Sequence, residues 1–367
     1  MAILAMAFFL EGALRSPAGE NGYPPTVTFR LPSLSKLSPI FTIVVFGFAI
    51  YAIYLELHKY SFGQIRDAVL AIPGWHVAIA AGLVIPGLIA LAGYDLVAAR
   101  HCRIGIGWWR PLATGLLGYS ITNTTGHGVL VGAMLRLRVY PRWGVSGRDV
   151  GMIVGFGVLT YYMGLSFVSS GALLLEGAEL TRLLSKLPKV GPVFAHEWFR
   201  YVIPSALLGA IAFWFVLTMV RRRPFMFRGH EVRLPGPGIG LLQLTASVAD
   251  LAIASTVLYV LLPPHHDLGW LAFVGIFSVV QFVALMSAVP GGIGVFTAIM
   301  LVVLAPRFPS EADLVASLIT FRVLYYLVPF LIGGLVFLVL TFTRRTKVGS
   351  EDPESDGKSP CRVHTGT

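Results

Sequence analysis

The stretch SAVPGGIGVF, residues 287–296, interrupts an apolar run that extends over about residues 269–305. A second stretch, SITNTTGHGVL at residues 120–130, interrupts the apolar run at about 110–136 in the same way. Both contain Gly-x-Gly-Val followed by an apolar residue. In a bilayer, a broken helix is tolerated only where protein or a wet cavity satisfies the freed N–H and C=O groups. The matched breaks therefore predict a paired internal site, and transporters place substrate sites at such breaks.

The composition is that of a membrane protein. Hydrophobic residues make up 56% of the 367 residues and charged residues 13%, and the mean hydropathy is +0.76. A soluble chain this apolar would lack a polar surface. The basic residues behind the net charge of +10 lie mostly in short loops between apolar runs. This is the positive-inside pattern, which reports orientation and does not indicate a nucleic-acid partner.

Hydropathy predicts an all-α polytopic fold with six full spans of roughly 20 residues each. The spans are expected at about 40–57, 74–99, 150–175, 198–220, 238–262 and 311–343. Residues 1–39 contain five prolines and are expected to form a flexible leader. Residues 344–367 are rich in Ser, Gly and acidic residues and are expected to form a disordered cytoplasmic tail. The predicted membrane domain is therefore 40–343.

Arginines determine the expected orientation. Loops 100–110, 136–148 and 221–233 carry three, four and five arginines, whereas loop 263–268 has neither Lys nor Arg. Cytoplasmic loops are enriched in basic residues, so the arginine-rich loops are placed inside. That placement requires two re-entrant hairpins, the first broken segment entering from the cytoplasm and the second from outside. Both termini are then cytoplasmic, in a bacterial inner membrane.

The glycine breaks belong to a longer internal similarity. The pattern DLxxA begins at residue 95 before the first break and at residue 250 before the second. After each break an Asp is followed twelve residues later by a Tyr pair, with the Asp at positions 149 and 313. Offsets of 155, 166 and 164 residues indicate one unit present twice, at about 74–176 and 238–341. Three full spans separate the starts of the units, so the repeats are predicted to be inverted, as in alternating-access transporters.

Arg322 is the most costly residue to place in the membrane. It lies near the middle of the run 311–343, where an arginine costs about 2.5–3.5 kcal/mol on insertion scales and needs a partner or a polar cavity. Its planar guanidinium can bind phosphate or carboxylate through two parallel hydrogen bonds. Two interpretations stay open: Arg322 binds a lipid phosphate, or it forms a permanent ion pair with Asp250. Both hold if a substrate competes for the pair.

The breaks also offer an anion site without side-chain charge, because half-helix N-termini expose N–H groups and glycines allow a headgroup to approach closely. The alternative is close helix packing through small residues. The predicted substrate-binding residues are Arg322, Asp250, Asn123, Thr124, Gly126, Gly128, Pro290, Gly291, Gly292, Gly294, Tyr325 and Tyr326. Asp95 and His127 are candidates for coupling. Their alternatives are a locally paired or snorkelling carboxylate and a histidine that is merely hydrogen-bonded.

No pattern predicts catalysis or a cofactor. The sequence has no P-loop, no metal motif and no nucleophile–base pairing at a recognisable spacing. Cys102 and Cys361 lie far apart and predict neither a disulfide framework nor a metal site. The expectation is a protein that is not an enzyme and that uses no metal.

The sequence resembles the transmembrane region of lysylphosphatidylglycerol synthases, the flippase-like membrane family. The similar stretches are GYDLVAARHCRIGIGWWRPLATGLLGYSITNTTGHG, LRLRVYPRWGVS, AVPGGIGVF and FRVLYYLVPF, within about residues 74–341. In the bifunctional members a separate cytosolic domain makes aminoacylated phosphatidylglycerol, and the membrane region moves it between leaflets. Nothing after Arg345 is expected to fold into such a domain. The resemblance thus implies a stand-alone lipid translocator and argues against lysyl transfer.

One position departs from that family. An acidic residue is common after PGGIGVF, and Thr297 stands there in this chain. If that carboxylate binds a cationic headgroup or a proton in the family, this protein is expected to bind a different lipid or to use a different driving force. Arg322 follows the family pattern, which favours an anionic lipid group.

These observations predict that the chain translocates or binds an anionic phospholipid or lipid-linked anion at a midplane site. The alternatives are a non-transporting lipid-binding accessory of a lipid-modifying pathway, such as hopanoid or glycolipid synthesis, and an intramembrane enzyme acting on a lipid. The expected partners are membrane lipids and a separate lipid-modifying enzyme. The sequence leaves open the headgroup, the energy source and the oligomeric state.

Overall fold

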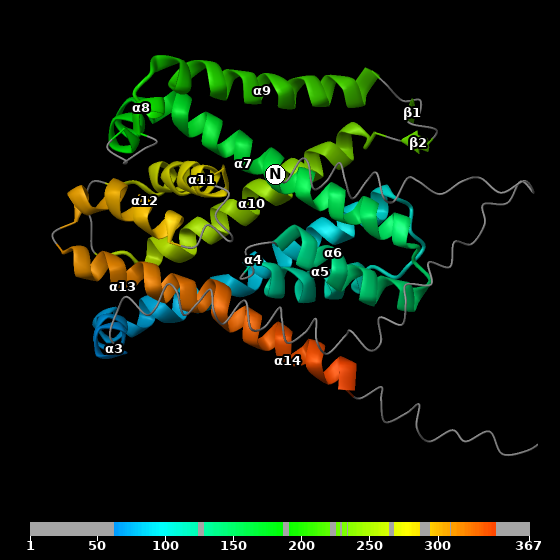
Figure 1. Cartoon of the computed structure of the whole chain (residues 1–367), viewed down its shortest axis with the longest axis horizontal. Helices are drawn as coiled ribbons and strands as arrows, with labels where there is room; N and C mark the ends of the chain where they lie inside the picture. Colours follow the sequence, from blue (N-terminus) through cyan, green and yellow to red (C-terminus); the bar gives the residue numbers. More distant parts are fainter. Residues whose placement is uncertain are drawn as a thin grey trace, which may run out of the picture.

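The structure, a computed structural model, describes most of the chain between residues 62 and 342. The described ranges are 62–123, 128–185, 191–220, 225–227, 230–232, 234–263, 268–286, 294–308 and 310–342. The predicted leader, the predicted span at 40–57 and the predicted tail lie outside these ranges. The fold is all-α and polytopic, as predicted, and its long helices run along a shared axis of the molecule (Figure 1).

Five long apolar segments cross the described part of the molecule (Figure 1). They are α4 Gly74–His101, α7 Gly147–Leu184, α9 Glu197–Val220, α10 Pro237–Leu261, and the continuous run of α13 Glu311–Arg322, η4 Val323–Leu327 and α14 Val328–Phe342. Each contains a stretch long and apolar enough to cross a bilayer. They correspond to five of the six predicted spans.

The elements outside these segments and outside the two glycine-broken segments are short. They are α3 Phe62–Ala71, η1 Tyr140–Trp143, α8 Gly191–Phe194, η3 Ala305–Arg307, β1 Phe225–Phe227 and β2 His230–Val232. β1 and β2 form an antiparallel hairpin inside the predicted cytoplasmic loop 221–233, which hydropathy alone did not indicate. Residues 177–184 continue α7 without a break.

Each glycine-broken segment forms two helices. The first gives α5 Trp109–Thr122 and α6 Gly128–Val139, and the second gives α11 Trp270–Met286 and α12 Val295–Leu304. α5 packs against α6, and α11 packs against α12. Figure 1 shows the first pair in the half of the molecule that ends near β1 and β2, and the second pair in the half that contains α8 and the start of α13. The two pairs occupy opposite halves, as two re-entrant hairpins entering from opposite sides require.

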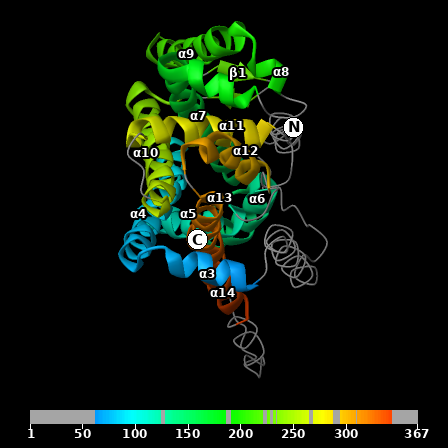
Figure 2. The same ribbon diagram turned by 90° about the vertical axis from the view of Figure 1, so that its left-hand side faces the viewer.

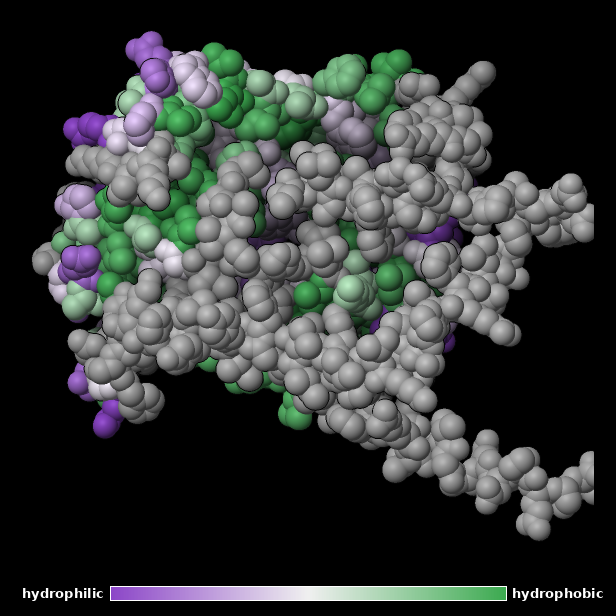
Figure 3. All heavy atoms as spheres, in the orientation of Figure 1, coloured by the Kyte–Doolittle hydropathy of each residue, from purple (hydrophilic) through white to green (hydrophobic). Residues whose placement is uncertain are grey.

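α4 and α10 pack against each other, and α7 contacts both. Val84 of α4 and Val257 of α10 belong to the same buried apolar cluster. α9 lies at one edge of the molecule in Figure 2 and exposes Val202, Phe213 and Val220. Where Figure 3 is not grey, many of the visible residues are apolar, and hydrophilic ones gather at the end where α3 and α8 lie. A surface that faces lipid tails explains this exposure.

The long helices that follow the two breaks begin in the same way. The Ser146 hydroxyl accepts a hydrogen bond from the backbone N–H of Asp149 at 3.2 Å, and the Ser310 hydroxyl accepts one from that of Asp313 at 3.3 Å. Serine satisfies an otherwise unpaired N–H at a helix start, and an acidic residue in the first turn suits the helix dipole. Asp149 and Asp313 thus recur because each helps to start a long helix.

Candidate functional site

Asp250 lies in the middle of α10 and is 3% exposed. The Tyr94 hydroxyl from α4 donates a hydrogen bond to its Oδ2 at 2.9 Å. The Tyr325 hydroxyl from η4 donates to its Oδ1 at 3.4 Å. Buried carboxylates need such donors because losing water is costly. Three helical elements therefore meet at this carboxylate.

A small residue on α4 allows this meeting. A Cβ added at Gly87 would lie 3.2 Å from the Ile253 side chain and 3.4 Å from the Tyr325 ring and hydroxyl. Gly87 lies two helical turns before Tyr94, so both residues occupy the same face of α4. That face is pressed against α10 and η4. The absence of a side chain at Gly87 leaves room for the Tyr325 ring beside Asp250.

The π-helical turn η4, Val323–Leu327, follows Arg322 directly. Such turns are rare, interrupt the α-helical hydrogen-bond pattern and occur frequently at functional sites. η4 carries Tyr325 and Tyr326, whose rings lie 5.5 Å apart. The sequence analysis named both tyrosines but treated 311–343 as one regular helix. No residue pattern in that run distinguishes a π turn from an α turn.

Arg322 is half-buried, and aromatic rings flank its guanidinium. The ring centroid of Phe296 lies 5.6 Å from Cζ, and that of Tyr326 lies 5.3 Å from it. Rings stabilise a guanidinium at such distances through their negative faces. Phe296 is the second residue of α12, the helix that begins after the second break. The structure therefore places Arg322 beside the first turn of the helix that follows the second break.

Gly294 has a backbone role at this break. Its φ is 75°, a region that residues with a side chain rarely adopt, and it directly precedes α12. The chain turns here and starts the helix that carries Phe296 over Arg322. The second glycine of the motif is thus needed for the turn, whatever binds nearby.

Asp250 and Arg322, for which an ion pair was one of the two open interpretations, form no ion pair in this structure. Both oxygens of the Asp250 carboxylate already accept hydrogen bonds from tyrosine hydroxyls. Arg322 turns instead toward Phe296 and Tyr326. The physical reason is that a neutral hydroxyl satisfies a carboxylate oxygen without bringing a second charge into the core.

A second buried carboxylate, Asp95 on α4, has a different environment. Nε and Nη2 of Arg136 donate to its Oδ2 and Oδ1 at 2.8 and 2.7 Å, and the Tyr140 hydroxyl donates to Oδ2 at 3.0 Å. Asp95 is 1% exposed and Arg136 4%. Asp95 is therefore locally paired, one of the two interpretations left open for it. Its partner is Arg136 of α6, which the sequence analysis had assigned to a cytoplasmic loop.

Two glycines make room for that arginine. A Cβ at Gly118 of α5 would lie 3.0 Å from Nη1 of Arg136, and one at Gly132 of α6 would lie 2.9 Å from it. The guanidinium also lies 4.6 Å from the ring centroid of Tyr119. A signal for this burial exists in the sequence, because Gly132 and Arg136 are one helical turn apart in an apolar segment. The positive-inside rule instead predicts that Arg136 lies in the cytoplasmic loop 136–148.

Aromatic rings connect the two carboxylate sites. The Tyr119 ring, which lies on Arg136, meets the Tyr94 ring edge to face at 5.8 Å. The resulting row of contacts runs through Asp95, Arg136, Tyr119, Tyr94, Asp250, Tyr325, Tyr326 and Arg322. Tyr94, Tyr119 and Arg136 were not among the predicted site residues. The structure thus shows one continuous polar and aromatic core with an acid–base pair at one end and Arg322 at the other.

Several predicted site residues cannot be placed in this row. Thr124, Gly126, His127, Pro290, Gly291 and Gly292 lie outside the described residues. Asn123 ends α5, where its backbone N–H bonds to the Tyr119 carbonyl at 3.1 Å. Gly128 begins α6. Their proposed contact with a substrate stays a prediction.

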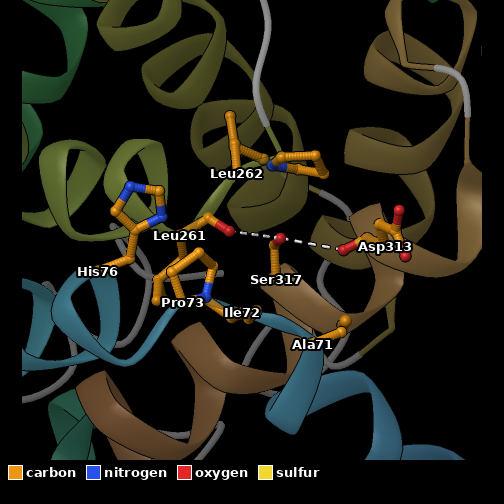
Figure 4. A pocket seen from close by; sticks show the side chains of 10 residues that line it. Ala71, Ile72, Pro73, His76, Leu261, Leu262, Asp313 and Ser317 are labelled. Carbon is orange, nitrogen blue, oxygen red and sulfur yellow. Dashed lines mark hydrogen bonds between the residues drawn. The ribbon is translucent and has the colours of Figure 1, made fainter.

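A small cavity of about 120 Å³ lies away from this row, at the end of α10 (Figure 4). It is bordered by the α3–α4 turn, by Leu261 and by the start of α13. Inside it, the Ser317 hydroxyl donates to the carbonyl oxygens of Leu261 at 2.6 Å and Asp313 at 3.0 Å (Figure 4). Leu261 is about 16 Å along the helix from Asp250 at 1.5 Å per residue. The cavity is therefore separate from the candidate site.

Curated proteins similar to this chain include membrane proteins from different bacteria. An uncharacterized protein of Synechocystis, slr0712, is 29% identical over 314 residues, covering 84% of this chain and 94% of the relative. The inner membrane protein YbhN of Escherichia coli is 24% identical over 268 residues, covering 71% and 79%. The phosphatidylglycerol lysyltransferase of Staphylococcus haemolyticus is 24% identical over 304 residues, covering 82% of this chain but 34% of the enzyme. No protein-family model matches the chain.

The chain is homologous to the N-terminal part of phosphatidylglycerol lysyltransferases. This confirms the resemblance inferred from the glycine and tyrosine motifs. The chain corresponds to about a third, 34%, of the lysyltransferase length. Together, the apolar helices and the homology support a multi-pass membrane protein.

Proposed function

We propose that this protein binds an anionic lipid headgroup at Arg322 and moves the lipid between the leaflets of the bacterial inner membrane. The observation that carries the proposal is the position of Arg322. It is a cation in the middle of a membrane-crossing run, set beside the helix that follows the second break. Intramembrane charges are costly and usually mark substrate or ion pathways.

The surroundings of Arg322 suit an anion. Phe296 of α12 lies against the guanidinium, so the N-terminal end of α12 is close to it. The first N–H groups of a helix lack partners within the helix and carry the positive end of its dipole. A headgroup phosphate at this position can accept hydrogen bonds from the guanidinium of Arg322 and from the first N–H groups of α12. The partly buried ring of Tyr326 provides a face for the apolar part of the lipid.

The arrangement of the broken segments supports movement as well as binding. α5 with α6 and α11 with α12 lie in opposite halves of the molecule (Figure 1). In the proposed inverted repeat, these pairs open the central row of residues alternately to the two sides of the membrane. Both termini then lie in the cytoplasm. A lipid could reach Arg322 from one leaflet and leave it toward the other.

Leaflet exchange of labelled phosphatidylglycerol in proteoliposomes tests the proposal. Arg322→Ala removes charge-assisted hydrogen bonds worth about 1.5–3 kcal/mol each, so exchange should fall by roughly tenfold or more. Arg322→Lys keeps the charge but loses the planar guanidinium. Its rate of lipid exchange should therefore lie between those of Arg322→Ala and wild type. Arg200→Ala is the matched control, because Arg200 also lies over an aromatic ring, 4.9 Å from that of Tyr201, but at the start of the peripheral α9.

The outcomes separate transport from binding. Undiminished exchange in a correctly folded Arg322→Ala protein would remove the arginine from the mechanism. Lipid binding by wild type with no exchange above protein-free liposomes would leave a lipid-binding accessory protein in place of a translocator.

A further inference from the structure

Asp95 and Asp250 begin the same DLxxA pattern but have different hydrogen-bond donors. Asp95 accepts from both Nε and Nη2 of Arg136 and from Tyr140. Asp250 accepts from the hydroxyls of Tyr94 and Tyr325. In the part of the chain that the structure describes, Asp250 has no basic side chain as a hydrogen-bond or ion-pair partner. The difference in donors determines which protonation states each carboxylate can adopt.

A guanidinium only donates hydrogen bonds and cannot lose its proton in a protein. At Asp95 both carboxylate oxygens face a group that can only donate, and removing either partner would leave the other as a buried, unpaired charge. A tyrosine hydroxyl both donates and accepts. Tyr94 and Tyr325 can donate to an ionised Asp250 and, by rotating their hydroxyl hydrogens, accept from a protonated one. Either state of Asp250 keeps its partners.

The groups around Asp250 fit proton exchange better than metal-ion binding. Besides Tyr94 and Tyr325, the titratable groups within electrostatic range are Tyr119 from α5 and Tyr161 from α7. Tyr161 accepts a hydrogen bond from the Gln281 amide at 3.2 Å. Arg322, from α13, lies beyond Tyr326 in the same row. Two hydroxyls and one carboxylate supply fewer oxygen ligands than the roughly six that a hard cation takes.

We propose that Asp250 reversibly binds a proton and that this protonation is coupled to the movement of lipid at Arg322. Tyr325 connects the two sites, because its hydroxyl bonds to Asp250 and its ring contacts Tyr326, which lies on Arg322. The proton that Asp250 takes up forms an O–H bond on one carboxylate oxygen. When it is released, the carboxylate again accepts from both tyrosines. No other reactant is involved.

The coupling step rests on the proposed lipid movement, whereas proton binding itself does not. Infrared difference spectra of the full-length protein in liposomes measure the protonated carboxyl directly. Wild type should show a protonated-carboxyl band that disappears as the pH is raised between about 5 and 9. Asp250→Asn should lack this band, and Asp149→Asn, which changes an exposed carboxylate bonded to Ser146, should retain it. A titration curve that is the same in Asp250→Asn and wild type would overturn the proposal.

The second measurement follows lipid exchange under an imposed pH gradient. In wild type, a gradient of one pH unit should change the ratio of inward to outward exchange by up to tenfold, as expected for one proton per lipid. Whatever exchange Asp250→Asn retains should have the same ratio of inward to outward movement with and without the gradient, and Asp250→Glu should recover the response. A response to sodium replacement in place of pH would contradict the proton assignment. If wild type exchanges no lipid, the proposed function and the coupling fail together, while the infrared result still decides proton binding.

Discussion

At the residue scale, two aspartates in the same local sequence have opposite roles. Asp95 forms a two-point ion pair with Arg136, and both residues are almost fully buried. Asp250 is held by neutral hydroxyls. The first arrangement fixes α6 against α4, and the second leaves the carboxylate able to change its charge. Residue identity alone does not distinguish them, because the donors come from other helices.

The Asp95–Arg136 pair should be sensitive to the loss of either partner. Asp95→Asn or Arg136→Met alone leaves a buried charge uncompensated and should destabilise the protein by about 3–5 kcal/mol. The double variant should recover much of the loss, since no isolated charge remains. Thermal unfolding in mild detergent measures this, with Glu197→Gln, which changes an exposed carboxylate on the peripheral α9, as the control. Losses that simply add in the double variant would show that the two side chains do not stabilise each other.

At the element scale, close contacts between helices depend on small residues. α5 approaches α4 at Gly115, where an added Cβ would lie 2.8 Å from the carbonyl oxygen of Ala92 and 2.9 Å from its Cα. Backbone atoms cannot move aside as a flexible side chain can. This contact sets the distance at which Tyr119 of α5 meets Tyr94 of α4. The first broken segment is thus positioned by a glycine outside its break.

Gly115→Ala should therefore force α5 away from α4. We expect a destabilisation of about 1–3 kcal/mol, the usual cost of overpacking. Gly93→Ala is the matched control, because nothing lies within 4 Å of a Cβ at that position and alanine favours a helix. Melting temperatures of the two variants give the comparison. Equal stability of both would mean that α4 and α5 are not held this close.

The elements themselves were largely predictable from the sequence. Apolar runs indicated the spans that became α4, α7, α9, α10 and the α13–α14 run, since spanning a bilayer requires length and hydropathy. The glycine breaks indicated the two helix pairs. The π turn η4 was not predictable, because its hydrogen-bond register depends on what packs around Tyr325. The burial of Arg136 was missed for a similar reason, since its partner Asp95 is 41 residues away along the chain.

At the scale of the whole molecule, the site lies where both predicted units meet. Tyr94 and Tyr119 come from the first unit and Asp250, Arg322 and Tyr325 from the second. The matching serine caps of α7 and α13, together with helix pairs in opposite halves, support the proposed inverted repeat. In such a repeat, a change in one unit that alters the Asp250 contacts also alters those of Tyr94 in the other. We propose this linkage as the structural basis for coupling charge at Asp250 to access at Arg322.

The central claim is that Arg322 holds the phosphate of an anionic lipid. A density map of the full-length protein in nanodiscs that contain phosphatidylglycerol tests it most directly. We expect headgroup density within about 3 Å of the guanidinium nitrogens, beside the first turn of α12, and its absence in Arg322→Ala. Arg322 covered only by protein side chains in lipid-filled nanodiscs, or identical lipid density in both proteins, would contradict the account.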